Sequence, residues 1–143
     1  MGGKIYTRLG ARYHATKHAL EGWSDSLRLE LAPIGIRVVV IEPGQIETGF
    51  GAAASQGLRE RSRATAYATA YATVANRVAD VMDQSYGRGR GTDPKVIADV
   101  VGDAVRAARP RTRYVAGKYA RLMIGVRKWL GDRAFDRLIL SRM

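Results

Sequence analysis

Apolar side chains recur at helical spacing between residues 11 and 31. The stripe consists of Ala19, Leu20, Trp23, Leu27 and Leu31, and charged residues lie on another face. This periodicity predicts one long amphipathic helix. The helix should end near Pro33, because a proline disfavours helical geometry at the residue before it, and Gly35 supplies a turn.

A run of β-branched residues follows at 37–41, where Arg37 leads into Val-Val-Val-Ile. Because no polar residue alternates within this run, it predicts a strand that is buried on both faces of a parallel sheet. Pro43 and Gly44 should end the strand abruptly. A helix, a tight turn and an apolar strand form the αβ half of a βαβ unit, so the predicted fold class is α/β.

The composition changes at residues 49–91, which are rich in alanine, threonine and glycine. We expect a flexible entry, a helix and a hinge in this region. Tyr67 and Tyr71 are four residues apart and would share one face of that helix. The pattern leaves open whether they pack against the body of the domain or contact a substrate.

The remainder of the chain predicts three further helices and a second strand. Asp93 and Pro94 open the first helix, which should close before Pro110. A short strand is expected at 113–117, followed by two short basic helices at about 119–130 and 133–140.

Composition limits the chemistry of the chain. It has no cysteine and only two histidines, which excludes disulfides, thiolate zinc sites and cysteine nucleophiles, and we expect no metal site. No segment has the uninterrupted apolar length that a membrane span requires, so the sequence predicts a soluble, cytoplasmic protein.

The formal net charge of +11 is concentrated near the end of the chain. From Arg106 onward there are eleven lysines or arginines against two aspartates. We expect a solvated basic face and no specific nucleic-acid site, because net charge alone carries no specificity. The basic helix at 119–130 is also amphipathic, so a weak peripheral contact with an anionic membrane is a further expectation.

Tyr13 and Lys17 are the candidate catalytic pair. Their four-residue spacing at the start of the long helix places both side chains on one face. A tyrosine with its ordinary pKa of about 10 is a poor base at neutral pH, but a nearby ammonium favours the phenolate and lowers that pKa. Such a tyrosine could exchange a proton with an alcohol or a carbonyl group.

Residues 2–50 closely resemble the short-chain dehydrogenases/reductases. The order and spacing of Tyr13, Lys17, Pro43 and Gly44, followed by Thr48, carry the resemblance. It implies the C-terminal part of a Rossmann-like, doubly wound parallel sheet. It also implies an NAD- or NADP-dependent oxidoreductase that interconverts an alcohol and a ketone or aldehyde.

The resemblance also implies a role for each residue of the pair. Tyr13 would be the general acid and base and would also contact the cofactor. Lys17 would hold the ribose hydroxyls of the nicotinamide and lower the pKa of the tyrosine. Family members commonly pair through this helix, so we expect a homodimer through residues 11–32. The stretches 93–98 and 109–114 are similar to steroid and retinol dehydrogenases, which implies a small hydrophobic alcohol or carbonyl substrate.

The residues after the strand would bind the cofactor if the resemblance holds. Pro43 and Gly44 would form a turn that lets the backbone approach the nicotinamide. Ile46 would make main-chain contacts to its carboxamide, and Thr48 would offer a hydroxyl. Independently of the resemblance, open parallel sheets bind ligands outside the carboxyl ends of their strands, where Pro43 and Gly44 fall.

The predicted organisation is one domain with three parts. Residues 1–48 would hold the catalytic helix, the strand and the Pro-Gly turn, and residues 49–92 would cover the substrate. Residues 93–143 would form the C-terminal helix, strand and basic helices.

The resemblance extends over about the second half of a family member, which has roughly 250 residues. The Gly-rich phosphate turn, the residue that selects NAD or NADP and the catalytic serine would all precede Met1. We therefore expect residues 1–143 to be inactive alone, with an exposed apolar stripe on the long helix. Two alternatives stay open: a non-catalytic basic protein that binds acidic lipid or nucleic acid, and the non-functional product of a truncated gene.

Overall fold

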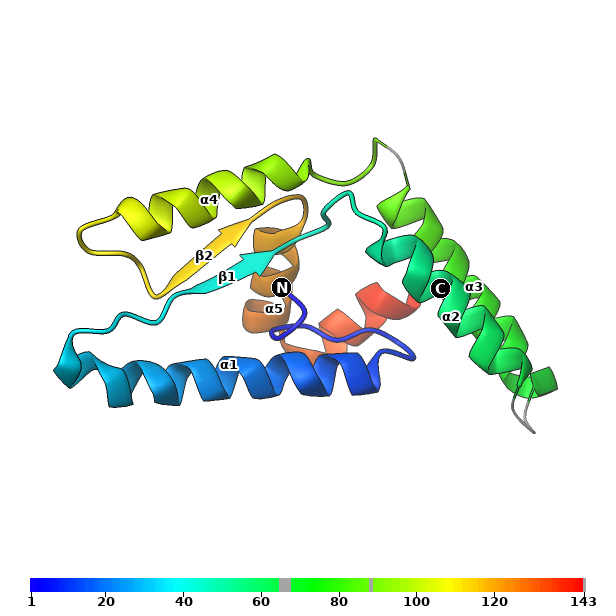
Figure 1. The fold of residues 1–143 in the computed structure, drawn as a ribbon. Coiled ribbons are helices and arrows are strands. Elements are labelled where there is room, and N and C mark those ends of the chain that lie inside the picture. The colour runs from blue at the N-terminus through cyan, green and yellow to red at the C-terminus, as the bar shows by residue number, and fades with distance from the viewer. Residues whose placement is uncertain (65–67, 88, 143) are drawn as a thin grey trace.

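The computed structural model describes residues 1–64, 68–87 and 89–142 and shows an α/β fold (Figure 1). The elements in chain order are α1 (Ala11–Leu31), the short 3-10 helix η1 (Ala32–Ile34), β1 (Val40–Pro43), α2 (Phe50–Arg63), α3 (Ala68–Tyr86), α4 (Pro94–Arg106), β2 (Arg113–Ala116) and α5 (Ala120–Leu140). The described part of the chain therefore has the partial Rossmann-like architecture that the sequence predicts.

The long helix α1 is confirmed. It ends at Leu31, the 3-10 helix η1 tightens the next turn, and Gly35 adopts the left-handed conformation with φ of +80°. The exposed apolar stripe is confirmed for Leu20 and Trp23, and Trp23 is 62% exposed. Helix α1 thus presents apolar surface that the described residues do not cover.

Strand β1 lies about three residues later than the sequence predicts. It spans Val40–Pro43 instead of 37–41 and pairs with β2 in parallel, so that Val40 lies opposite Arg113. Residues 37–39 have no neighbouring strand in the described structure, and without that partner they do not join the sheet. For the same reason the valines are only half-buried, and the expected burial on both faces is wrong here.

Helices α2 and α3 form a hairpin of two packed helices (Figure 1). The expected flexible entry is wrong, because α2 begins directly at Phe50. Small residues let the two helices approach closely, and the buried ones are Gly51, Ser55 and Ser62 of α2 and Ala75, Val78 and Ala79 of α3. Arg59 of α2 joins the helices through ion pairs with Asp80 at 2.7 Å and Asp83 at 2.9 Å. Tyr67 lies outside the described residues.

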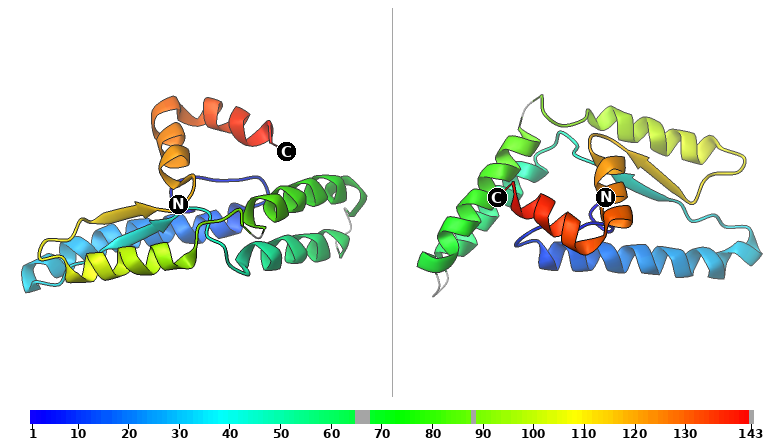
Figure 2. Two further views of the ribbon diagram at one scale, coloured as in Figure 1. Left: turned by 90° about the horizontal axis from the view of Figure 1, so that it is seen from above. Right: turned by 180° about the vertical axis from the view of Figure 1, so that it is seen from behind.

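The two strands lie between helices on opposite sides (Figure 2). Helix α4 contacts both strands, and the first half of α5 contacts β2 from the other side. Helix α4 begins at Asp93 and Pro94 as predicted, and the structure shows that the Asp93 carboxylate caps it by accepting a hydrogen bond of 2.7 Å from the Lys95 backbone N–H. The α4 residues that face the sheet are Ile97, Val100 and the buried Ala104.

The two predicted basic helices are joined as the two halves of α5. Gly131 breaks the helix with φ of +73° and ψ of −179°, a conformation that favours glycine. The two halves meet at a corner that stands away from the layer of α1, the sheet and α4 (Figure 2). Within the described residues, no helix is both long and apolar enough to cross a membrane.

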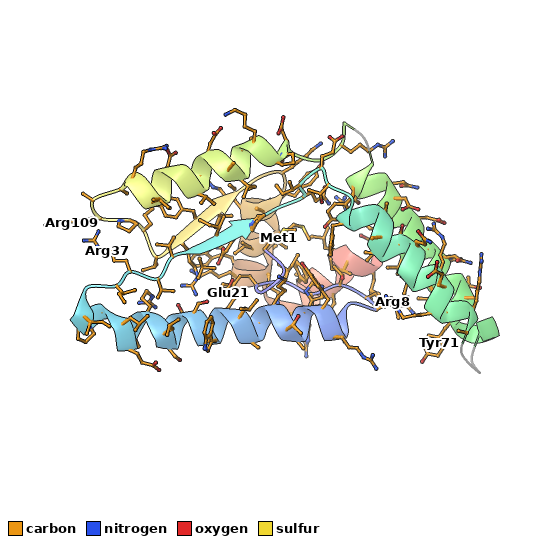
Figure 3. All side chains as sticks on the ribbon, in the orientation of Figure 1. Met1, Arg8, Glu21, Arg37, Tyr71 and Arg109 are labelled. Carbon is orange, nitrogen blue, oxygen red and sulfur yellow. The ribbon has the colours of Figure 1, made fainter. Side chains whose placement is uncertain are left out.

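Charged side chains connect α1 to the sheet. Arg113 of β2 pairs with Glu21 at 3.0 Å, Asp25 at 2.7 Å and Glu42 at 3.2 Å. Figure 3 shows Glu21 in the space between α1 and the amino-terminal Met1. One cation thus serves three carboxylates from α1 and β1, and we call these four residues the Arg113 cluster.

The surroundings shift the pKa values of the Arg113 cluster in opposite directions. Hydrogen bonds from Arg113 and Arg28 lower the pKa of Asp25 to about 2. Burial raises the pKa of Glu42, which is only 3% exposed and lies near Glu21. Glu42 is therefore the member whose charge is most costly to keep.

Candidate active site

The amino-terminal ends of α1 and α2 both lie beyond the carboxyl end of β1 (Figure 1). Tyr13 is the third residue of α1, and its ring centroid lies 5.7 Å from that of Phe50, the first residue of α2. Phe50 in turn contacts Tyr86 at the end of α3, with 6.3 Å between ring centroids. The fold therefore brings Tyr13 and the segment that follows β1 to one place.

Lys17 lies on the same face of α1 as Tyr13, as the spacing predicts. Its Nζ atom is 5.8 Å from the centroid of the tyrosine ring and lies over the ring. This distance allows a cation–π contact. It also leaves the ammonium beside the aromatic face and free to serve a ligand.

The pKa of Tyr13 departs from the expectation. Burial raises it above its ordinary value, whereas the sequence predicted that Lys17 would lower it. The physical reason is that the phenol loses solvent against its neighbours while the ammonium lies over the ring. The tyrosine is therefore a protonated phenol at neutral pH, and the raised pKa makes it a weaker acid than an ordinary tyrosine.

The amino-terminal segment packs against Tyr13. A Cβ atom on Gly2 would lie only 3.1 Å from the tyrosine hydroxyl oxygen. The buried His14 holds this segment, with its Nδ1 atom 2.8 Å from the Gly2 carbonyl and its Nε2 atom 3.0 Å from the Thr7 hydroxyl. Both ring nitrogens of His14 are therefore engaged within the protein.

Phe50 and Tyr86 are the neighbours of Tyr13 that the sequence did not reveal. Phe50 follows the predicted strand and turn, so its closeness in sequence to Thr48 was the available signal. Tyr86 had no such signal, because its approach depends on the angle of the α2–α3 hairpin. Tyr71, on the same hairpin, is half-exposed.

Pro43 and Gly44 stand where β1 ends, as expected, but Gly44 already has a close neighbour. A Cβ atom at Gly44 would lie 2.2 Å from the Lys118 carbonyl oxygen and 3.0 Å from the Gly117 carbonyl oxygen. The Gly44 N–H also donates a hydrogen bond of 2.7 Å to the Ala116 carbonyl. The missing side chain thus lets the segment after β1 approach the segment after β2.

Replacing Gly44 with alanine should destabilise the protein. The added methyl would meet backbone carbonyls, which cannot move as a flexible side chain can, so the free energy of unfolding should fall by about 2 kcal/mol. Urea denaturation measures this. The matched control is Gly22→Ala, because a Cβ atom there has nothing within 4 Å and a helical alanine is favoured over glycine by about 1 kcal/mol. Equal midpoints for the two variants would contradict the close approach at Gly44.

Ile46 pairs with Thr92 in a parallel bridge. The flanking groups make the hydrogen bonds of this bridge: the Glu47 N–H donates to the Thr92 carbonyl and the Thr92 N–H donates to the Gln45 carbonyl, each at 2.9 Å. In a parallel bridge the N–H and C=O of the central residue point the other way. Among the described residues, neither of these two groups of Ile46 has a hydrogen-bond partner.

Thr48 lies two residues beyond Ile46, immediately before α2. Its hydroxyl oxygen accepts a hydrogen bond of 3.3 Å from the Phe50 N–H. Because a hydroxyl also has a proton to donate, Thr48 retains one free donor. Ile46 and Thr48 together offer an amide N–H, a carbonyl and a hydroxyl along one short segment.

Comparison with known proteins identifies relatives along the whole chain. Residues 1–59 match the family model described as short chain dehydrogenase. The chain is 31% identical over 142 residues, 99% of its length, to the short-chain dehydrogenase srdE of Neurospora crassa, of which it covers 46%. It is 28% identical to the uncharacterized oxidoreductase YbbO of Escherichia coli K12, covering 96% of the chain and 44% of that protein.

A further similar protein is retinol dehydrogenase 16 of Rattus norvegicus. The identity is 30% over 112 residues, which is 76% of this chain and 35% of the rat protein. The chain spans about half the length of the first curated relatives it matches, between 44% and 53%.

Proposed function

Because the chain belongs to the short-chain dehydrogenase/reductase family, we propose that it carries the proton-transfer residues of an NAD- or NADP-dependent oxidoreductase. The reaction would interconvert an alcohol and a ketone or aldehyde. The observation that supports this most directly is the position of Tyr13 and Lys17, which share one face of α1 beyond the carboxyl end of β1.

Tyr13 is the proposed general acid and base. Its phenol is protonated at neutral pH, as in an ordinary tyrosine, so it has a proton to give to a carbonyl oxygen during reduction. In the reverse direction the phenolate must form, and the positive charge of Lys17 would favour it. When bound, a nicotinamide cofactor supplies or accepts the hydride.

The residues present fit the nicotinamide end of such a cofactor. A carboxamide has two N–H donors and a carbonyl acceptor, and the unpartnered carbonyl and N–H of Ile46 complement them. Thr48 adds its hydroxyl donor, and Lys17 would hold the ribose hydroxyls. The role of Pro43 and Gly44 would be indirect, because Gly44 packs against the backbone at Lys118 and so fixes the course of the segment.

The substrate is proposed to be a small hydrophobic alcohol or carbonyl compound. The ring of Phe50 lies beside Tyr13, and the ring of Tyr86 lies beside Phe50, which supports an apolar ligand at this position. The similarity to a protein named retinol dehydrogenase agrees with this class. The exposed Leu20 and Trp23 support the further proposal that two copies pair through α1.

Residues 1–143 alone are proposed to be inactive. The described sheet has two strands, and the sequence contains no Gly-rich turn between a strand and a helix that could bind a pyrophosphate. Gly2 also packs against the hydroxyl of Tyr13. The pair is therefore expected to act only where a nucleotide-binding half is supplied.

A chimera tests this function. The amino-terminal half of the Neurospora relative would be joined before Met1, and consumption of NADH and NADPH would be followed with a panel of hydrophobic ketones and aldehydes. We expect turnover by the chimera and none by residues 1–143 or by the donated half alone. A folded chimera that binds NADH or NADPH but reduces no compound of the panel would contradict the proposal.

A further inference from the structure

The inner face of α5 is fixed to the body of the protein. Phe135 is fully buried and meets the ring of Tyr6 edge to face, with 5.1 Å between the ring centroids. The Tyr6 hydroxyl donates a hydrogen bond of 2.7 Å to Asp136, and the guanidinium carbon of Arg127 lies 4.6 Å from the centroid of the same ring. These contacts determine which side of α5 faces outward.

The outward side of α5 carries large apolar residues. Leu122, Trp129 and Leu130 are all exposed, and Trp129 is 78% exposed. Leu122 and Trp129 are seven residues apart, which places them on one helix face about two turns apart. Leu130 and Trp129 precede the break at Gly131, where the two halves of α5 form the projecting corner in Figure 2. We call Leu122, Trp129 and Leu130 the outer stripe.

Positive charge surrounds the outer stripe. Helix α5 contains five lysines or arginines and two aspartates, and the exposed basic residues are Arg121, Lys128, Arg133 and Arg137. Both aspartates are already engaged, Asp132 by Arg127 and Asp136 by Tyr6. Because the basic residues of α5 outnumber its aspartates, the field next to the outer stripe is positive.

Helix α1 provides an internal comparison. It also exposes a tryptophan, Trp23, but it has three lysines or arginines balanced by three acidic residues. Of these two helices, α5 is the one that combines an exposed apolar stripe with excess positive charge at a projecting corner. Tryptophan and leucine with flanking cations is the combination that binds at the interface of an anionic bilayer, where the rings enter the headgroup region and the cations meet phosphates.

We propose that the outer stripe and its flanking cations bind the protein to the surface of a membrane that contains anionic lipid. Trp129 and Leu130 would enter the headgroup and acyl boundary, while Lys128 and Arg133 would contact lipid phosphates. Nucleic acid is the less favoured partner, because the exposed leucines would gain nothing against phosphates and would remain in water.

The two tryptophans make the test specific, because the chain has no others. Trp23→Phe leaves Trp129 as the only reporter, and Trp129→Phe leaves Trp23. Vesicles of phosphatidylcholine, with or without phosphatidylglycerol, would be added to residues 1–143. We expect the Trp129 emission to shift to the blue and to resist acrylamide quenching with anionic vesicles only, while the Trp23 emission stays unchanged.

Flotation of the same vesicles measures affinity. Trp129→Ala with Leu130→Ala should weaken binding by about tenfold or more, since two large apolar side chains no longer leave water. Lys128→Glu with Arg133→Glu should also weaken it, and high salt should weaken wild-type binding. The matched control, Arg61→Glu with Arg77→Glu, changes the net charge equally on the exposed surface of the α2–α3 hairpin and should bind like wild type.

Three results would overturn the proposal. One is the absence of flotation with anionic vesicles by a wild-type chain whose circular dichroism shows it to be folded. Another is equal weakening by the two charge-reversed pairs, which would indicate a response to net charge alone. The last is retention of a single-stranded RNA oligonucleotide under conditions where the vesicles are not bound.

Discussion

Replacing Tyr13 with phenylalanine should abolish turnover by the chimera. The substitution removes the only atom through which Tyr13 can exchange a proton, and it keeps the ring that contacts Phe50. General acid–base groups typically contribute about a hundredfold to ten-thousandfold in rate, so kcat should fall by that factor. Steady-state kinetics of carbonyl reduction by NADH or NADPH measures the loss.

The control for Tyr13→Phe is a second tyrosine whose hydroxyl has a structural role. Tyr114 on β2 accepts a hydrogen bond of 3.2 Å from the Arg111 N–H, and Tyr114→Phe should leave kcat within a few-fold of wild type. Cofactor affinity should change much less than kcat in Tyr13→Phe, because Lys17, Ile46 and Thr48 are intact and Tyr13 loses only its hydroxyl. A variant that keeps more than about a tenth of the wild-type rate would contradict the assigned role.

Replacing Arg113 with leucine should cause the largest loss of stability. Arg113 is the cation that Glu21, Asp25 and Glu42 share, and Glu42 is almost fully buried. Without Arg113, the buried carboxylate of Glu42 loses its paired charge. Removal of one partner from a buried ion pair costs about 3 kcal/mol. Urea denaturation of residues 1–143, followed by circular dichroism, should show a lower midpoint or a chain already unfolded.

A second variant keeps this prediction testable if Arg113→Leu does not fold. Burial already raises the pKa of the Glu42 carboxyl group, so its charged form is costly. Adding Glu42→Gln removes that charge, and the double variant should regain part of the lost stability. Arg111→Leu is the exposed control and should change the midpoint little. The account of the Arg113 cluster would be wrong if the double variant were less stable than Arg113→Leu alone.

The elements that the sequence predicted well are those with strong local signals. Helix α1 has a long apolar stripe and ends at a proline and a glycine, and α4 has an aspartate cap followed by a proline. The sequence predicted two short basic helices at 119–130 and 133–140, and the break in α5 at Gly131 falls between them. In each case the information lies within a few neighbouring residues, so no distant partner is needed to interpret it.

The errors arose where distant residues decide the outcome. The valines of 37–39 have the composition of a buried strand, yet a strand forms only where a neighbour can accept its hydrogen bonds, and β2 meets the chain from Val40 onward. The α2–α3 hairpin was missed because its cohesion comes from small buried residues and from Arg59, whose partners lie on the other helix.

In the candidate site, too, the features set by neighbouring residues were predicted and those set by tertiary packing were not. The spacing of Tyr13 and Lys17 was sufficient to place them on one face, and the end of β1 located Ile46 and Thr48. The direction in which the pKa of Tyr13 shifts could not be predicted from spacing, because the shift depends on how far Gly2 and Phe50 exclude water from the ring. The closeness of Tyr86 likewise depends on tertiary packing.

The parallel pairing of β1 with β2 affects the order in which the chain folds. Helices α2, α3 and α4 lie between β1 and β2 in the sequence. Val40 and Arg113 must therefore close a long loop before any hydrogen bond between the two strands forms. Helices α2 and α3 are neighbours in sequence and can pack without that entropic cost. The helical hairpin should therefore form early and bring the ends of its loop together, and the sheet, which positions the segment from Ile46 to Thr48, should form late.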